Sequence, residues 1–331
     1  MVEMTYRDAL KQALRDAMTE DDSVVVIGEE VGRYGGAYGV TKGLYEEFGS
    51  ERMIDTPISE PAIVGAAVGA AMAGLRPVAE LMYVDFIGMT MDQLGNQAAK
   101  IRYMFGGQIG VPMILRTQGG TGRSAGAQHS QSLEAYVMHT PGLRLVMPAT
   151  VSDAYHLLRQ SLKQPDPVVF IEHKALYTLK EEVDLSAPAP AWGKAVVRRT
   201  GDDLVIVTYS RQVHHAMAAA EALARKGIEA TVIDLRCLNP LDFDTVRAHV
   251  ERVGRAMVVS EGVMTAGVGA ELSARIHEEC FDFLEEPVIR VCGEDIPISV
   301  SVELEKHSVP TPDLIRTVAE RLAGRHVGQA A

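Results

Sequence analysis

Short apolar runs alternate along the chain with stretches of helical periodicity. Continuous runs of strand length, rich in β-branched residues, predict buried parallel strands at Ser23–Ile27, Arg76–Val84, Val111–Thr117, Leu143–Met147 and Pro167–Glu172. The stretches between them predict helices at Glu60–Leu75, Phe86–Met104, Ser132–His139 and Val151–Lys163. This alternation is typical of an α/β domain built on a doubly wound parallel sheet.

A Pro/Ala segment interrupts the alternation at Ser186–Ala191, and the pattern then begins again. The second half predicts strands at Leu204–Tyr209, Ala230–Leu235, Arg255–Ser260 and Pro287–Cys292. Its predicted helices are Arg211–Arg225, Asp242–Val253, Gly267–Cys280 and Pro312–Leu322. We therefore expect two doubly wound domains, at residues 1–186 and 195–331, joined by a linker at residues 187–194.

Composition narrows the class of protein. A chain of 331 residues that is 47% hydrophobic can bury two cores. Its formal net charge of -12 argues against a nucleic-acid binder, which needs a basic surface. The three cysteines show no CxxC spacing and suit a reducing compartment. The N-terminal stretch carries Glu3, Asp8 and Asp16, which is unlike a targeting signal, and no apolar run reaches membrane-spanning length, so we expect a cytoplasmic protein.

One candidate for proton-transfer chemistry is an acid at the start of a helix of small residues. The segment Asp55-Thr56-Pro57-Ile58-Ser59-Glu60 precedes residues 61–74, in which Ala, Gly, Val, Ile and Met predominate. A helix without a polar face is expected to be buried all round, so the carboxyl of Glu60 should be desolvated. The simpler interpretation is an acid that complements the helix dipole. A carboxyl in apolar surroundings is nevertheless a candidate for proton transfer.

The second candidate is a histidine after a glycine-rich loop. Gly119–Gly126 follows a predicted strand and leads into Ala127-Gln128-His129-Ser130-Gln131. The loop fits a dinucleotide-binding motif only loosely, because no helix begins directly after it. We interpret it as a mobile active-site loop. His129 is then either a catalytic residue or a structural histidine.

These two segments and much of the remaining chain resemble the thiamin-diphosphate-binding β subunits of 2-oxo acid and acetoin dehydrogenase complexes. Ser260-Glu261-Gly262 and Gly267–Glu271 resemble the C-terminal domain of transketolases. Residues 98–107 and 172–178 look most like the pyruvate and acetoin versions. The proline-rich segment usual near the C-terminus of the family is altered here, as Asp295–Val300. The resemblance implies a pyrimidine-binding domain followed by a smaller transketolase C-terminal-like domain.

The resemblance also implies roles for individual residues. Glu60 is expected to hydrogen-bond a ring nitrogen of the aminopyrimidine of thiamin diphosphate and so promote the imino tautomer of that ring. A nitrogen of this tautomer removes the proton from the thiazolium carbon. Phe86 is expected to pack on that ring, and Ile58 to line the same cofactor site. His129 is expected to assist substrate binding and acyl transfer to a lipoyl group.

The diphosphate half of such a site is missing from the sequence. Its usual signature is Gly-Asp-Gly followed by Asn, whereas this chain has only Gly201-Asp202-Asp203. We therefore expect no Mg²⁺ site in this chain. The resemblance implies that an α subunit holds Mg²⁺ and the diphosphate, in an α2β2 assembly. That assembly is expected to pass its product to a lipoyl-bearing acyltransferase core. Some members of the family bind K⁺, which would correspond here to a site near Met113, Ser161, Leu162, Gln164 and Asp166; the alternative is an ordinary turn.

Two other functions remain open at this point. The chain could be a non-catalytic subunit that organises a complex, or a stand-alone dinucleotide-dependent oxidoreductase. Within the thiamin interpretation, the substrate could be pyruvate, a branched 2-oxo acid or acetoin.

Overall fold

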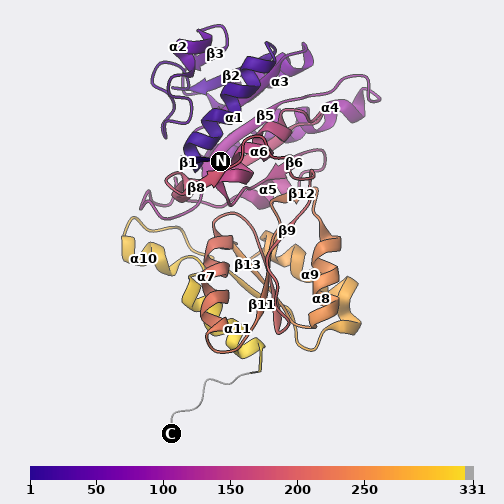
Figure 1. Ribbon diagram of the computed structural model, residues 1–331. Helices are drawn as coiled ribbons and strands as arrows, with labels where there is room; N and C mark the ends of the chain where they lie inside the picture. Colours follow the sequence, from indigo (N-terminus) through magenta and orange to yellow (C-terminus); the bar gives the residue numbers. More distant parts are fainter. Residues whose placement is uncertain (325–331) are drawn as a thin grey trace. The chain divides into compact units, whose positions relative to one another are not determined.

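The computed structural model describes residues 1–324, and the chain divides into two compact units. Unit 1 consists of Met1–Gly119 and Tyr136–Trp192 (Figure 1). Unit 2 consists of Gly120–Ala135 and the chain from Gly193 onward. The segment Gly120–Ala135 lies in the range that the sequence assigns to the first domain, yet it packs with unit 2.

A parallel sheet forms the centre of unit 1, with its strands in the order β6-β7-β5-β4-β2-β3. These strands are β2 (Val24–Glu29), β3 (Met53–Thr56), β4 (Arg76–Leu81), β5 (Ile114–Gly119), β6 (Arg144–Val146) and β7 (Val168–His173). The five predicted strands are confirmed, with ends shifted by up to three residues, and β3 was missed. A separate antiparallel pair joins β1 (Val2–Thr5) to β8 (Lys180–Val183).

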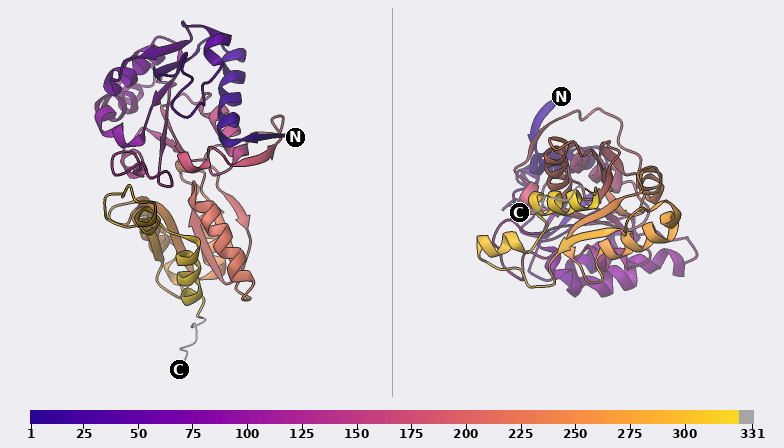
Figure 2. Two further views of the ribbon diagram at one scale, coloured as in Figure 1. Left: turned by 90° about the vertical axis from the view of Figure 1, so that its left-hand side faces the viewer. Right: turned by 90° about the horizontal axis from the view of Figure 1, so that it is seen from below.

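Helices cover both faces of this sheet. They are α1 (Tyr6–Glu20), α2 (Leu44–Phe48), α3 (Glu60–Met72), α4 (Ala99–Met104), α5 (Glu134–Met138), α6 (Val151–Ser161) and the short turns η1 (Val84–Thr90), η2 (Asp92–Ala98) and η3 (Lys174–Leu176). Helices α1 and α6 pack together, whereas α3 packs on β4 and on η1 and η2 (Figure 2). The single helix predicted at Phe86–Met104 is instead a 3-10 turn, a π-helical turn and a short α-helix.

Unit 2 contains a five-stranded sheet in the order β14-β13-β10-β11-β9. Its strands are β9 (Val196–Arg199), β10 (Leu204–Thr208), β11 (Ala230–Asp234), β13 (Ala256–Val263) and β14 (Ile289–Gly293), and β12 (Cys237–Asn239) lies outside this sheet. All pair in parallel except β9, which runs antiparallel to β11 and was not predicted. The helices are α7 (Gln212–Ala224), α8 (Phe243–Val253), α9 (Val268–Cys280), η4 (Phe281–Phe283), α10 (Val302–His307) and α11 (Pro312–Leu322).

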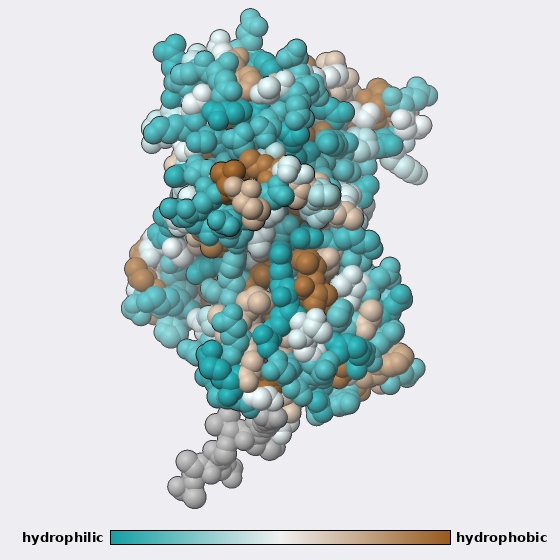
Figure 3. Space-filling view, in the orientation of Figure 1, coloured by the Kyte–Doolittle hydropathy of each residue, from teal (hydrophilic) through white to brown (hydrophobic). Residues whose placement is uncertain are grey.

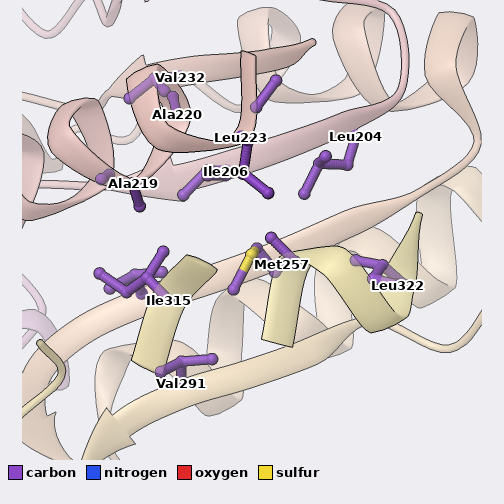
Figure 4. Close-up of a cluster of buried hydrophobic side chains, with 14 of the residues drawn as sticks. Leu204, Ile206, Ala219, Ala220, Leu223, Val232, Met257, Val291, Ile315 and Leu322 are labelled. Atoms are coloured by element: carbon purple, nitrogen blue, oxygen red, sulfur yellow. The ribbon is translucent and has the colours of Figure 1, made fainter. Parts of the chain in front are cut away.

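The core of unit 2 lies between its sheet and the pair α7 and α11. Alternate residues of the strands, such as Leu204 and Ile206 in β10, point to this side and meet Leu223 of α7 and Ile315 of α11 (Figure 4). Strand side chains alternate between the two faces, so the other residues of β10 face α8, which packs on the same strand. The doubly wound pattern predicted for the second half is therefore confirmed.

Apolar residues on the surface form separate small areas within a mainly hydrophilic face (Figure 3). All three cysteines, Cys237, Cys280 and Cys292, are buried. No helix within residues 1–324 is long and apolar enough to cross a membrane.

Candidate functional site

Glu60 is the first residue of α3 and follows the N-cap residue Ser59. Its side chain is half-buried, so the expectation of a fully desolvated carboxyl is wrong for this chain by itself. The cause lies in α3, which buries Ile63 and Val64 but exposes Ala62 and, at 41%, Met72. The prediction that this helix is buried all round is therefore also wrong: it is apolar on both faces, but unit 1 covers only one of them.

The segment before Glu60 is fixed by a contact that the sequence did not suggest. Asp55 accepts a hydrogen bond of 2.6 Å from the backbone N–H of Gly32 through Oδ1. A Cβ atom at Gly32 would lie 2.4 Å from the Asp55 carboxylate, so only glycine permits this approach. Asp55 therefore orients the polypeptide that leads through Ile58, whose side chain is 73% exposed, to Glu60.

A group of acids lies near the start of α3. Burial and the negative charges of Glu30 and Glu60 raise the pKa of Glu29 above its ordinary value. Glu29 is the last residue of β2, and β3 beside it ends at Thr56. The hydroxyl oxygen of Thr56 is buried without a hydrogen-bond partner among the described residues. The carboxyl edge of these strands thus combines acids close to one another with a buried polar atom.

Phe86 lies in η1, just after β4, and is half-buried. Its ring meets Tyr83 edge to face, with centroids 6.4 Å apart, and Tyr83 in turn meets Tyr38 at 6.1 Å. The ammonium of Lys174, which is fully buried, lies 5.8 Å from the Tyr83 ring centroid. Tyr83 thus packs against one side of the Phe86 ring and is itself held by Tyr38 and Lys174.

An ion cluster inside unit 1 was missed by the sequence analysis. Arg116 of β5 pairs with Glu80 of β4 and with Glu172 of β7, and all three are almost completely buried. Tyr177 donates a hydrogen bond of 2.6 Å to Glu172. Burial raises the pKa of Glu172, and the charge of Arg116 opposes this shift. The signal in the sequence was a charged residue inside each of three segments predicted to form buried strands.

His129 belongs to unit 2, in the loop that follows β5. The loop is closed at its base by a hydrogen bond of 2.9 Å from the Gly120 N–H to the Gln131 carbonyl. Gly120, Gly122 and Gly126 all have positive φ, the conformation for which glycine was expected here. His129 is half-buried, and its backbone N–H donates to the Gly126 carbonyl.

Four residues of the expected K⁺ site lie at the C-terminal end of α6 or just after it, and the fifth, Met113, directly precedes β5. The carbonyl of Leu162 accepts a hydrogen bond of 2.6 Å from the guanidinium of Arg76. Both carboxylate oxygens of Asp166 pair with arginines, at 2.9 Å to Arg102 and 3.2 Å to Arg144. Backbone N–H groups donate to the carbonyls of two of the three remaining candidates, Met113 and Ser161. Arginine side chains thus contact two of the five candidates, Leu162 and Asp166.

No group of three or more His, Cys, Asp or Glu side chains within residues 1–324 is arranged to hold a metal ion.

Comparison with known proteins identifies the family. Residues 2–180 match the model of the transketolase pyrimidine-binding domain, and residues 193–315 match that of the transketolase C-terminal domain. The chain is 43% identical to the mitochondrial pyruvate dehydrogenase E1 component subunit beta-2 of Oryza sativa subsp. japonica, over 99% of this chain and 89% of that protein. It is also 43% identical to the acetoin:2,6-dichlorophenolindophenol oxidoreductase subunit beta of Cupriavidus necator, over 98% and 99% of the two chains. The chain belongs to this family of transketolase-like dehydrogenase β subunits.

Solved structures place the β-subunit family within the wider transketolase fold. A split-gene transketolase in the form of an inactive beta4 tetramer superposes with a TM-score of 0.79 at 18% identity, covering 97% of this chain and 98% of that one. The transketolase from Leishmania mexicana gives 0.72 at 17% identity, covering 100% of this chain and 47% of that one. The expected fold class, with two α/β domains of transketolase type, is confirmed.

Proposed function

We propose that this chain is the β subunit of a thiamin-diphosphate-dependent dehydrogenase component that cleaves pyruvate, a related 2-oxo acid, or acetoin. The observation that carries the proposal is an identity of 43% over nearly the whole chain to β subunits of both pyruvate and acetoin enzymes. Family membership also favours thiamin chemistry over the dinucleotide-dependent alternative.

The residues of unit 1 fit the aminopyrimidine half of the cofactor. Glu60 offers a half-buried carboxyl at a helix start, Phe86 an aromatic face, and Ile58 an exposed apolar side chain. The buried hydroxyl of Thr56, which lacks a partner among residues 1–324, offers a further polar contact. When bound, thiamin diphosphate supplies the carbanion and the electron sink for cleaving the bond next to a carbonyl.

The chain's own contribution is to bind this ring and manage a proton. Glu60 would hold a proton at its carboxyl and share it with a nitrogen of the bound ring. Glu29, whose pKa is raised by burial and by the charges of Glu30 and Glu60, lies close to this carboxyl. Phe86 and Ile58 exclude water from the ring and fix its orientation.

His129 is proposed to bind the substrate and to assist transfer of the acyl unit to a lipoyl group on a partner acyltransferase. The imidazole can donate and accept a proton near neutral pH. The loop that carries it is closed at its base, so the ring is held by a defined backbone.

A second chain is proposed to hold the diphosphate and Mg²⁺, because the sequence lacks the motif that binds them. We propose an α subunit and an α2β2 tetramer, in which the exposed apolar face of α3 is covered. The crowding of arginines around Leu162 and Asp166 fits a K⁺ ion poorly, and we assign it no step. Cytoplasmic location remains part of the proposal.

The test is Glu60→Gln in the tetramer reconstituted with the cognate α chain. The amide keeps the size of the side chain but cannot give up a proton, so deuterium exchange at the thiazolium carbon should slow by about 10²- to 10⁴-fold. The matched control is Glu46→Gln, an exposed acid in the first turn of α2 that has the same relation to a helix dipole.

Assembly and cofactor binding should survive in both variants. Exchange at the wild-type rate in Glu60→Gln would remove this residue from the reaction. Equal slowing in both variants would indicate a general effect of acids at helix starts. Oxo acid or acetoin cleavage by the isolated β chain would contradict the proposed division of the site between two chains.

A further inference from the structure

The ligand-binding edge of the sheet in unit 2 is occupied by the chain itself. In open α/β sheets, ligands bind beyond the carboxyl ends of the strands where the strand order reverses. In unit 2 this point lies between β10 and β13, because the chain runs from β10 to β11 on one side and later returns to β13 on the other. The segment Gly120–Ala135 belongs to this unit and meets residues from both strand ends.

Both ends of that segment are bound there. At one end, Glu261 of β13 accepts hydrogen bonds from the N–H and the hydroxyl of Thr121, at 2.6 and 2.8 Å. At the other, Glu134 accepts a hydrogen bond of 2.7 Å from the hydroxyl of Tyr209, directly after β10. All four residues are at least nine-tenths buried. The contacts that could recognise a ligand are thus made to the loop.

A third acid holds the middle of the loop. Glu305 accepts hydrogen bonds from the backbone N–H groups of Gly122, at 2.9 Å, and Ser124, at 3.1 Å, and from the Ser124 hydroxyl. It is the one buried side chain of α10, although Val302 and Leu304 on the same helix are 55% and 60% exposed. A buried carboxylate requires hydrogen-bond donors such as these N–H groups. Because α10 buries its acid and exposes its apolar side chains, we infer that the contacts of Glu305 determine the orientation of this helix.

The altered segment before α10 contacts the same loop. Val300 lies so close to Gly126 that a Cβ atom there would be 2.8 Å from its Cγ1. Gly126 in turn accepts the backbone N–H of His129. The region in which the sequence departs from the family's proline-rich pattern is therefore the region that braces the loop.

We propose that Glu261 and Glu305 are positioning residues, which anchor the loop Gly120–Gln131 to unit 2 and thereby set the placement of His129. The inference rests on the proposed function in one respect, the role of His129 in acyl transfer. The anchoring itself is independent of that role and can be measured without any turnover.

The experiment compares Glu305→Gln with Glu303→Gln in the reconstituted tetramer. Glu303 lies on the same helix, but its side chain is 76% exposed and pairs only with Lys306 among the contacts found. Hydrogen exchange of peptides covering residues 120–131 should become about 10- to 100-fold faster in Glu305→Gln, as expected when hydrogen bonds to a charged group are lost. It should stay at the wild-type rate in Glu303→Gln. Glu261→Gln gives a second variant on a different element.

Turnover provides the second measurement. With lipoyl domain as acceptor, kcat should fall in Glu305→Gln far more than the rate with an artificial electron acceptor does, and it should stay at the wild-type value in Glu303→Gln. Unchanged exchange in both anchoring variants would overturn the proposal. Faster exchange without a fall in lipoyl-dependent kcat would overturn the positioning role.

Failure of the anchoring proposal can be distinguished from failure of the role proposed for His129. If His129→Ala retains full lipoyl-dependent turnover, the role of His129 is wrong, and exchange still decides whether the loop is anchored. Faster exchange throughout the strands of unit 2, with a lower melting temperature, would make Glu305 merely structural and would also overturn the proposal.

Discussion

Replacing Arg116 by methionine should destabilise unit 1 strongly, because it leaves two carboxylates without their cation. Arg116 is 1% exposed, and its ion-pair partners Glu80 and Glu172 have side chains 5% and 0% exposed. Methionine fills a comparable volume, so the loss is electrostatic rather than a cavity. Tyr177 would remain as a donor to Glu172 but carries no charge.

The expected cost is about 3–5 kcal/mol, the range found when one member of a buried ion pair is removed. For a domain of this size, each kcal/mol lowers Tm by about 2–4 °C, so Tm should fall by about 10 °C. The deficit should also depend on pH. Burial already raises the pKa of Glu172, and loss of Arg116 raises it further. A carboxyl whose pKa is raised by folding stabilises the fold only while protonated, and that contribution disappears as the pH rises.

Calorimetry at pH 6 and pH 8 tests this argument. The deficit should be larger at pH 8, and Glu80→Gln with Glu172→Gln in the Arg116→Met background should recover much of it. The control is Arg102→Met, which removes a partly exposed ion pair with Asp166 and should cost less than about 1 kcal/mol. A cost for Arg116→Met no greater than for Arg102→Met, or a deficit independent of pH, would refute the reasoning.

Two further predictions concern unit 2. Burial raises the pKa of Glu134, and its Oε2 has no hydrogen-bond partner among the described residues. Because the native carboxyl favours the fold only while it is protonated, Glu134→Gln should raise Tm at pH 8 more than at pH 5. An equal change in Tm at both pH values would contradict this prediction. His129→Ala should lower lipoyl-dependent turnover by about 10²-fold or more while dye-linked oxidation of the substrate changes far less, and a parallel loss in both assays with a lower Tm would make His129 a structural residue.

The strands were predictable because each is a short apolar run buried on both faces, as in β4 and β10. The exceptions have local causes. Strands β1 and β8 form a small antiparallel pair whose residues are mostly exposed or half-buried, so they lack the apolar signal. The stretch 84–104 has the composition of one helix but forms a 3-10 segment, a π-helical segment and a short α-helix in succession. Hydrophobic periodicity does not distinguish these helix types.

The sequence predicted candidate site residues only where residues adjacent in the sequence form a recognisable motif. Glu60 and His129 lie in compact local motifs that can be read along the chain. Glu261 and Glu305 contact the loop across 140 and 181 residues, and nothing near them in the sequence indicates that contact. Charged residues within apolar stretches, such as Arg116, were the one general signal of buried polar networks.

The half-buried state of Glu60 and the exposed apolar face of α3 have one common explanation in the proposed tetramer. A helix that is apolar on both faces is stable in water only if both faces are covered. Unit 1 covers the face that includes Ile63 and Val64, and in the proposed tetramer a second chain would cover the face that includes Ala62 and Met72. A chain that docks there also reaches the N-terminal end of the same helix. Covering α3 and desolvating Glu60 would then be a single event, which couples assembly of the tetramer to completion of the proton-transfer site.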